Sequence, residues 1–234
     1  IGDFTIRINN RKILTGFFNS LELNSKVTDI LRIIDKIEKI GEDEVKSELS
    51  LLDVDSDKVS KIIDFIRISG DAFTKIERLK NLGITDEVFN EGVNELETVI
   101  NNIKARGLDS SFYDVDLTIA RGLDYYTGTV YETILKDYPS IGSVCSGGRY
   151  ENLATYYTDK KLPGVGISIG LTRLFYQLKE AGVIKTTDSS VADITILPMT
   201  ENYEYVYKFS NLLKRFGVRV DTAFLGKFKQ LMRY

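Results

Sequence analysis

Residues 120–132 read ARGLDYYTGTVYE, with one predicted strand before this stretch and another that begins within it. Tyr125 and Tyr126 offer ring faces and hydroxyl groups that can hydrogen-bond a polar ligand within an apolar pocket. Arg121 offers a planar fork for a carboxylate or a phosphate. A packing explanation stays open beside this one, in which the tyrosines fill the core of a hairpin and Arg121 pairs with Asp124 at the surface.

Two glycine-bearing segments follow downstream. Residues 145–150 read CSGGRY; the glycines Gly147 and Gly148 let the backbone approach a ligand closely, although the segment by itself predicts a tight turn before a helix. Residues 164–174 read GVGISIGLTRL, which predicts a glycine-rich strand that runs into a helix with Arg173 in its first turn. This arrangement suits a nucleotide, since glycine permits close approach and arginine meets a phosphate, but the lysine of a Walker loop is missing.

Around these segments the periodicity of the chain changes twice. An alternating strand covers Phe4–Ile8, and apolar stripes with helical spacing occupy residues 20–106. The next zone reads as strands and turns, with strands expected at Tyr113–Ile119, Thr129–Leu135 and Ile141–Cys145. After a polar linker, a strand, a helix and a strand predict a parallel βαβ unit at residues 192–197, 201–216 and 218–221.

Composition excludes several classes of protein and of site. The 234 residues are 43% hydrophobic and 28% charged, with a net charge of −3, so a strongly basic nucleic-acid binder is excluded. The chain has no histidine, which excludes a histidine general base and histidine metal ligands. Its single cysteine, Cys145, excludes an intrachain disulfide. No apolar run reaches the roughly 18 residues of a membrane span.

Taken together and in this order, the three segments resemble histidyl-tRNA synthetase, a class II aminoacyl-tRNA synthetase. Residues 120–132 resemble the family signature, and residues 147–153 (GGRYENL) its second specific segment. Residues 164–174 are similar to motif 3, which is shared across class II enzymes. Residues 9–12 (NNRK) resemble the segment that leads into the family's helical insertion. The resemblance covers essentially the whole chain.

The resemblance implies a ligase that activates histidine with ATP to histidyl-adenylate and passes the histidyl group to tRNA(His). It implies that Arg121 is the principal catalytic residue, beside the histidine carboxylate and the α-phosphate. The histidine pocket would be formed by Arg121, Tyr125, Tyr126, Gly147, Gly148 and Tyr150. ATP would be bound by Arg121, Gly170 and Arg173.

The resemblance also implies Mg²⁺ as a cofactor beside ATP, a homodimer and a cytoplasmic location without a membrane partner. Position 172 is threonine where many relatives carry an acidic residue, so we assign no metal ligand. Motifs 1 and 2 are absent, and the anticodon-binding domain breaks off after its first βαβ unit. We therefore expect a fragment of a longer protein that does not catalyse adenylation by itself.

The implied fold is α+β: the antiparallel sheet of class II synthetases with flanking helices, a helical insertion subdomain, and the start of an α/β anticodon-binding domain. The expected parts are a catalytic-domain strand, the helical insertion, the histidine-binding segments with motif 3, a linker and a partial anticodon-binding domain, at residues 1–16, 17–110, 111–184, 185–190 and 191–234.

Two other functions stay open. The regulatory subunit of ATP phosphoribosyltransferase, a non-catalytic protein of histidine biosynthesis, resembles the catalytic domain of this synthetase. The intact ARGLDYYTG and the apparent anticodon-binding domain after Ser190 argue against it. A eukaryotic kinase-linked domain that resembles the synthetase is disfavoured by the intact arginine and tyrosine pair.

Overall fold

The computed structural model describes residues 3–120, 125–152, 155, 157–185 and 190–223. These residues belong to two compact units, Ile1–Leu178 and Lys179–Tyr234. The expected catalytic residue Arg121 lies outside the described residues, as does Leu153 at the end of the second family-specific segment.

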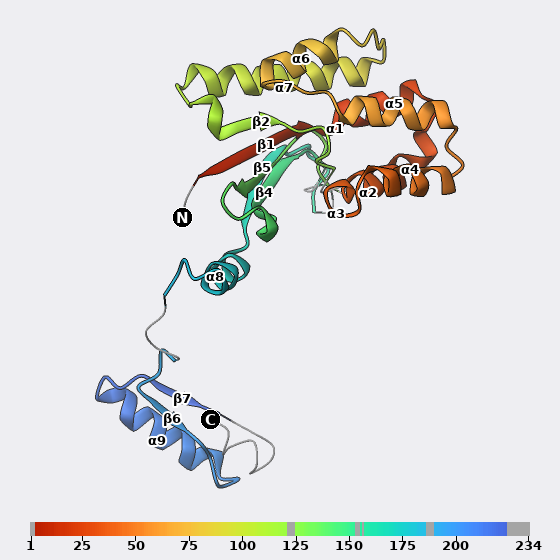
Figure 1. Ribbon diagram of the computed structural model, residues 1–234. Coiled ribbons are helices and arrows are strands. Elements are labelled where there is room, and N and C mark those ends of the chain that lie inside the picture. Colours follow the sequence, from red (N-terminus) through yellow and green to blue (C-terminus); the bar gives the residue numbers. More distant parts are fainter. Residues whose placement is uncertain (1–2, 121–124, 153–154, 156, 186–189, 224–234) are drawn as a thin grey trace. The chain divides into compact units, whose positions relative to one another are not determined.

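The first unit is built on a five-stranded sheet with the strand order β2-β1-β3-β4-β5 (Figure 1). Its strands are β1 (Phe4–Asn10), β2 (Tyr113–Val115), β3 (Thr129–Leu135), β4 (Ser143–Tyr150) and β5 (Gly164–Ile169). All pairings are antiparallel except that of β1 with β2. That pair is parallel because a long helical segment separates the two strands in sequence and returns the chain to the same end of the sheet. The expected α+β fold, a sheet with flanking helices, is confirmed.

Two strand predictions were wrong in detail. Alternation predicts a strand over Tyr113–Ile119, but β2 ends at Val115, because the Asp116 carboxylate accepts the backbone N–H and the hydroxyl of Thr118, at 2.9 and 2.6 Å, and turns the chain. Residues 145–150 alone predict a tight turn, but they belong to β4 and pair with β5 residue by residue. The glycines therefore lie within a strand, where they allow neighbouring backbone and side chains to approach closely.

Between β1 and β2 the chain is helical. The apolar stripes predict helices over residues 20–106, but the helical segment begins earlier, at Arg11, directly after β1. The helices are α1 (Arg11–Ser20), α2 (Val27–Ile34), α3 (Ile37–Ile40), α4 (Glu42–Leu51), α5 (Ser56–Ile66), α6 (Ala72–Lys80) and α7 (Glu87–Ala105), with 3₁₀ turns η1 (Asn24–Lys26) and η2 (Ser110–Phe112). Side chains cap three of them: Asn10, Asp71 and Asp86 accept a backbone N–H at the start of α1, α6 and α7.

The helices α1 and α7 cross closely, and this crossing joins the helical segment to the sheet. A Cβ added to Gly16 would lie 2.3 Å from the backbone nitrogen of Phe89, and one added to Gly92 would lie 2.6 Å from that of Ile13. Glycine is therefore required at both contacts. Buried side chains of these helices form one core with Ile8 and other sheet residues. Because α1 follows β1 directly, the packing of α1 in this core also fixes the position of β1.

The helix α8 (Leu171–Glu180) starts directly after β5, which confirms the predicted glycine-rich strand followed by a helix. In the second unit β6 (Ile194–Ile196) and β7 (Val220–Thr222) pair in parallel, and α9 (Tyr203–Arg215) connects them. The predicted parallel βαβ unit is thus confirmed. Within the described part of the chain, none of the helices combines the length and the apolarity needed to cross a bilayer.

The ion pair of Asp193 with Arg219 predicts a pH effect in the second unit. The side chain of Arg219 donates to this carboxylate at 2.7 and 3.2 Å, its backbone N–H donates at 2.9 Å, and together they lower the pKa of Asp193 from 3.8 to about 2. Because the folded-state pKa is depressed, the stabilisation is present above the unfolded value and is lost as the pH falls through the folded value. An NMR titration of the Asp193 carboxyl should show this low pKa, and Asp193→Asn should remove the matching loss of stability between about pH 4 and 2. A measured pKa near 3.8 would contradict the ion pair.

Candidate active site

The two faces of the sheet differ in chemistry. Residues directly opposite one another on neighbouring strands share a face. One such row across four strands is polar and consists of Arg7, Glu132, Ser146 and Ser168. The adjacent row, on the other face, consists of Ile8, Tyr131, Gly147 and Ile167. Ile8 and Tyr131 pack in the core under the helices, so the polar row faces away from that core.

Glycines make room for two aromatic rings beside the polar row. Gly148 lies between Val130 and Gly166 on the same face. A Cβ added to Gly148 would lie 2.8 Å from Cδ1 of Tyr126, so this ring rests directly on the glycine. The ring of Tyr150 covers Gly164 in the same manner, at 2.5 Å. The polar face thus carries Tyr126 and Tyr150, both expected from the sequence to form the histidine pocket.

Tyr125 and Tyr126 form an aromatic pair at the edge of this patch. Their ring centroids are 4.3 Å apart, and the ring planes are inclined by 60°. The side chain of Tyr125 is 49% exposed, whereas Tyr126 is partly buried. Burial, followed by the influence of Tyr125, raises the pKa of Tyr126 to about 12. The hydroxyl of Tyr126 therefore keeps its proton at neutral pH and can donate it to a ligand.

Gly147 lies on the opposite face from Gly148. The hydroxyl of Tyr131 donates to the carbonyl oxygen of Gly166 at 2.7 Å, and the tyrosine side chain passes over Gly147 to reach it. A Cβ added to Gly147 would lie 2.1 Å from that carbonyl oxygen and 2.7 Å from the Tyr131 hydroxyl. Gly147 can therefore contribute to the expected histidine pocket only through its backbone atoms.

A hollow of about 300 Å³ lies at one end of the polar row, and Arg7, Glu132 and Arg173 are among the residues that line it. The guanidinium of Arg173 donates to the carbonyl of Ile141 at 2.8 Å, which fixes its direction. Gly170 forms the junction between β5 and α8, because its N–H donates to Val144 at 3.2 Å and its carbonyl accepts the N–H of Leu174 at 2.8 Å. Two of the three residues expected to bind ATP, Gly170 and Arg173, thus lie where β5 meets α8.

We did not single out Arg7 and Glu132 from the sequence. Glu132 is only 7% exposed, although the buried Val130 and Ile134 flank it on the same face of β3. Arg7 forms an ion pair with Asp116 at 3.3 Å. The sequence did contain one signal for Glu132: it occupies a position in β3 where alternation predicts an apolar side chain. Acidic residues are seldom buried without a partner or a function.

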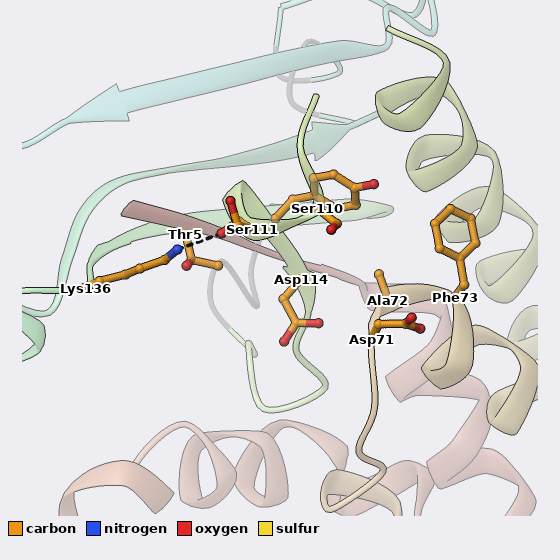
Figure 2. A pocket seen from close by; sticks show the side chains of 9 residues that line it. Thr5, Asp71, Ala72, Phe73, Ser110, Ser111, Asp114 and Lys136 are labelled. Atoms are coloured by element: carbon orange, nitrogen blue, oxygen red, sulfur yellow. Dashed lines mark hydrogen bonds between the residues drawn. The ribbon is translucent and has the colours of Figure 1, made fainter. Parts of the chain in front are cut away.

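A second hollow, of about 340 Å³, lies between α6 and the edge strand β2 (Figure 2). Its three charged side chains are already engaged within the protein. Lys136 donates to the carbonyl of Ser111 at 2.8 Å, Asp114 accepts from Lys75 at 2.7 Å, and Asp71 caps α6. The residues that line this hollow include none of the expected site residues, whereas the polar face carries Tyr126, Gly148 and Tyr150, so we favour that face as the active site.

No metal site is evident in the described part of the chain, because no three Asp, Glu or Cys side chains lie close enough to share an ion. Glu132 is the acidic member of the polar row. Thr172 lies in the first turn of α8. These residues do not by themselves assemble a Mg²⁺ site, and we assign no ligand.

Comparison with known proteins gives one consistent result. A sequence model of histidyl-tRNA synthetase matches residues 1–174. The histidine–tRNA ligase of Clostridium tetani is 56% identical over 213 residues, which cover 91% of this chain and 48% of that protein. The ligase of Trichormus variabilis is 48% identical over 97% of this chain and 51% of its own length. The chain therefore spans about half the length of the curated relatives it matches.

Solved structures agree with the sequence matches. The crystal structure of histidyl-tRNA synthetase from Nostoc sp. PCC 7120 superposes with a TM-score of 0.77 at 44% identity, covering 99% of this chain and 55% of that one. A Bacillus halodurans structure described as an ATP phosphoribosyltransferase regulatory subunit/histidyl-tRNA synthetase has a TM-score of 0.62 at 16% identity. That second likeness is one of fold alone.

Proposed function

This chain belongs to the histidyl-tRNA synthetase family, and we propose that the polar face of its sheet binds histidine and ATP for the synthetase reaction. In that reaction histidine and ATP form histidyl-adenylate, and the histidyl group then passes to tRNA. The observation that carries the proposal is the tyrosine pair of the family signature, with Tyr126 resting on Gly148 on the polar face.

Histidine recognition is assigned to the aromatic patch. The partly buried hydroxyl of Tyr126 stays protonated at neutral pH and can donate to the imidazole ring or another polar group of the amino acid. The ring of Tyr150 supplies a second apolar wall on the same face. Polar groups placed in an apolar pocket discriminate strongly, because a ligand that lacks their partner leaves them unpaired. We assign Tyr125, which is half-exposed, to the rim.

The first reaction step requires alignment and charge stabilisation rather than a base. The histidine carboxylate is already ionised at neutral pH. Its oxygen forms a bond to the α-phosphorus, and the bond to pyrophosphate breaks with its electron pair on the leaving group. We assign Arg121 to the charge that develops at the α-phosphate, and Arg173 to the rest of the triphosphate. In the second step a tRNA hydroxyl attacks the acyl carbon, and AMP leaves.

The remaining partners are proposed from family membership. They are tRNA(His), Mg²⁺ bound with ATP, and a second copy of the protein in a homodimer that acts in the cytoplasm. The ligase function is favoured over the regulatory subunit because a ligase is 56% identical to this chain. The structure whose description includes the regulatory subunit is 16% identical and shares the fold.

Histidine titration of the 234-residue chain tests the proposal. We expect wild-type protein to bind histidine in isothermal titration calorimetry and to discriminate against lysine. Gly148→Ala should weaken histidine binding by about tenfold, because the new methyl group displaces the Tyr126 ring from its seat. Gly166→Ala in the same row is the comparison: its nearest atom, Cε1 of Tyr150, is 3.5 Å away, so the methyl group displaces no ring and affinity should fall less than in Gly148→Ala. Wild-type protein that binds no histidine, or two variants with equal affinity, would refute the assignment.

A further inference from the structure

The hollow at one end of the polar row is built from two parts of the first unit. Its charged and apolar lining residues from the sheet and α8 include Arg7, Glu132 and Arg173, and those from the helical segment between β1 and β2 are Asp35, Ile37 and Lys39. Asp35 follows α2 directly, and Lys39 lies in α3. At about 300 Å³ the hollow is at the small end of the range of ligand sites. The helical segment therefore borders the end of the sheet where Arg173 is expected to bind ATP.

Arg173 is oriented toward this hollow by the connection between β3 and β4, which contains the 3₁₀ turn η3 (Pro139–Ile141). Its Nη2 donates to the carbonyl of Ile141 at 2.8 Å and lies 3.5 Å from the position of a Cβ added to Gly142. This hydrogen bond uses one of the five N–H donors of the guanidinium, so the others can serve a ligand. A planar cation whose direction is fixed in this way suits a phosphate.

Lys39 brings a second cation to the hollow, from the helical segment. Ile37 and Ile40 on either side of it pack against the core, so its backbone is fixed while its side chain is exposed. In the part of the chain that the structure describes, its ammonium group has no hydrogen bond or ion pair. Lys36, three positions earlier, pairs instead with Glu48 at 3.3 Å. The charge of Lys39 is therefore available to a ligand in the hollow.

The carboxylates of the hollow are directed to other groups than these two cations. Asp35 and Glu132 each interact with further groups of the chain, and neither Lys39 nor Arg173 takes part in those interactions. Arg7 forms an ion pair with Asp116 at 3.3 Å, which compensates its charge. Two cations from separate segments thus remain for a ligand that carries several negative charges on neighbouring oxygens, as a pyrophosphate group does.

We propose that this hollow binds the β- and γ-phosphates of ATP, and the pyrophosphate that leaves, between Arg173 and Lys39. The helical segment thereby supplies a phosphate-binding residue to a site whose other cation comes from α8. This inference rests on the proposed function, which makes ATP the source of the phosphates. Because the β- and γ-phosphates keep their charge before and after the reaction, Lys39 binds the nucleotide and is no catalytic residue.

Titration of inorganic pyrophosphate into the 234-residue chain, followed by isothermal titration calorimetry, tests the site without the reaction. Lys39→Ala should weaken binding by about tenfold, because it removes a charge-assisted hydrogen bond. Lys39→Arg should keep the affinity within about threefold of wild type, since it retains the charge. The matched control is Lys36→Ala, which removes the same charge three positions away and should change the affinity by less than about twofold.

A second measurement separates phosphate binding from a general structural defect. In ATP–pyrophosphate exchange by a protein of the relatives' full length, Lys39→Ala should raise the KM for ATP by about tenfold. The KM for histidine should rise by less than about twofold, because the aromatic patch that is assigned to histidine does not include Lys39. A purely structural defect would raise both KM values.

Equal losses of pyrophosphate affinity in Lys39→Ala and Lys36→Ala would overturn the proposal, because they would indicate general attraction of the anion to a basic surface. A wild-type chain that binds no pyrophosphate would overturn it as well. A chain that binds pyrophosphate through Lys39 but binds no histidine would keep this phosphate site and refute the proposed function.

Discussion

Replacing Arg121 by alanine should reduce histidine-dependent ATP–pyrophosphate exchange by at least about a hundredfold, since removal of one group that stabilises transition-state charge costs this much or more. The measurement requires a protein of the relatives' full length that carries these residues, because this chain spans 48% of the Clostridium tetani ligase. The maximal rate should fall more than histidine affinity, because the assigned role of Arg121 is exerted mainly on the charge that develops at the α-phosphate.

Arg149→Ala is the matched control for this prediction. Arg149, like Arg121, is an arginine next to a glycine in sequence, but its side chain is 42% exposed and pairs with Glu151 at 3.4 Å. An exposed ion pair of this kind contributes little to stability, and Arg149 has no assigned role in catalysis. The rate of ATP–pyrophosphate exchange should therefore stay within about twofold of wild type. Equal activity of the two variants, or full activity of Arg121→Ala, would remove Arg121 from the catalytic role.

Replacing Gly147 by alanine should lower the free energy of unfolding by about 3 kcal/mol, because the new methyl group would overlap a backbone carbonyl oxygen and a hydrogen-bonded hydroxyl. The Cβ would lie 2.1 Å from the carbonyl oxygen of Gly166, which is backbone in the neighbouring strand, and 2.7 Å from the hydroxyl of Tyr131. Either β4 and β5 separate or the tyrosine leaves its hydrogen bond. Urea unfolding followed by tyrosine fluorescence would measure the loss, since the chain contains no tryptophan.

Two further variants give this prediction its controls. Gly166→Ala on β5 should cost less than about 1 kcal/mol, because its Cβ would make an ordinary contact at 3.5 Å. Tyr131→Phe in the Gly147→Ala background should add little, because either adjustment to the methyl group already separates the Tyr131 hydroxyl from the carbonyl of Gly166. Fully additive losses from the two substitutions would show that Gly147 and Tyr131 do not act together.

Much of the fold was predictable because its signals are local. Helical spacing of apolar residues locates the helices between β1 and β2, and strand alternation predicts β3 at its observed bounds, Thr129–Leu135. The glycine-rich strand before a helix is likewise a local pattern, and β5 and α8 follow it. The turn at Asp116 was missed because an aspartate that bonds its own backbone competes with a strand without disturbing the alternation of its neighbours.

The candidate site was predictable only in part. Tyr126, Gly148 and Tyr150 come together on one face, as the family signature suggests. Gly147 and Gly148 looked equivalent in sequence, yet one supports the path of Tyr131 and the other the ring of Tyr126. Which glycine faces which side follows from the register of β4 against β3 and β5, and a shift by one residue would exchange them.

By itself the sequence determined the family, the order of helices and strands, and the residue types available for binding, because motifs and periodicity depend on neighbours along the chain. Tertiary structure alone decided that Arg7, Glu132, Ser146 and Ser168 form one row, and that Asn9 reaches Ile119 across 110 positions. Such contacts depend on strand register and on the path of the chain between strands. The polar face that carries Tyr126 and Tyr150 therefore forms only when the strands of the sheet pair in this register.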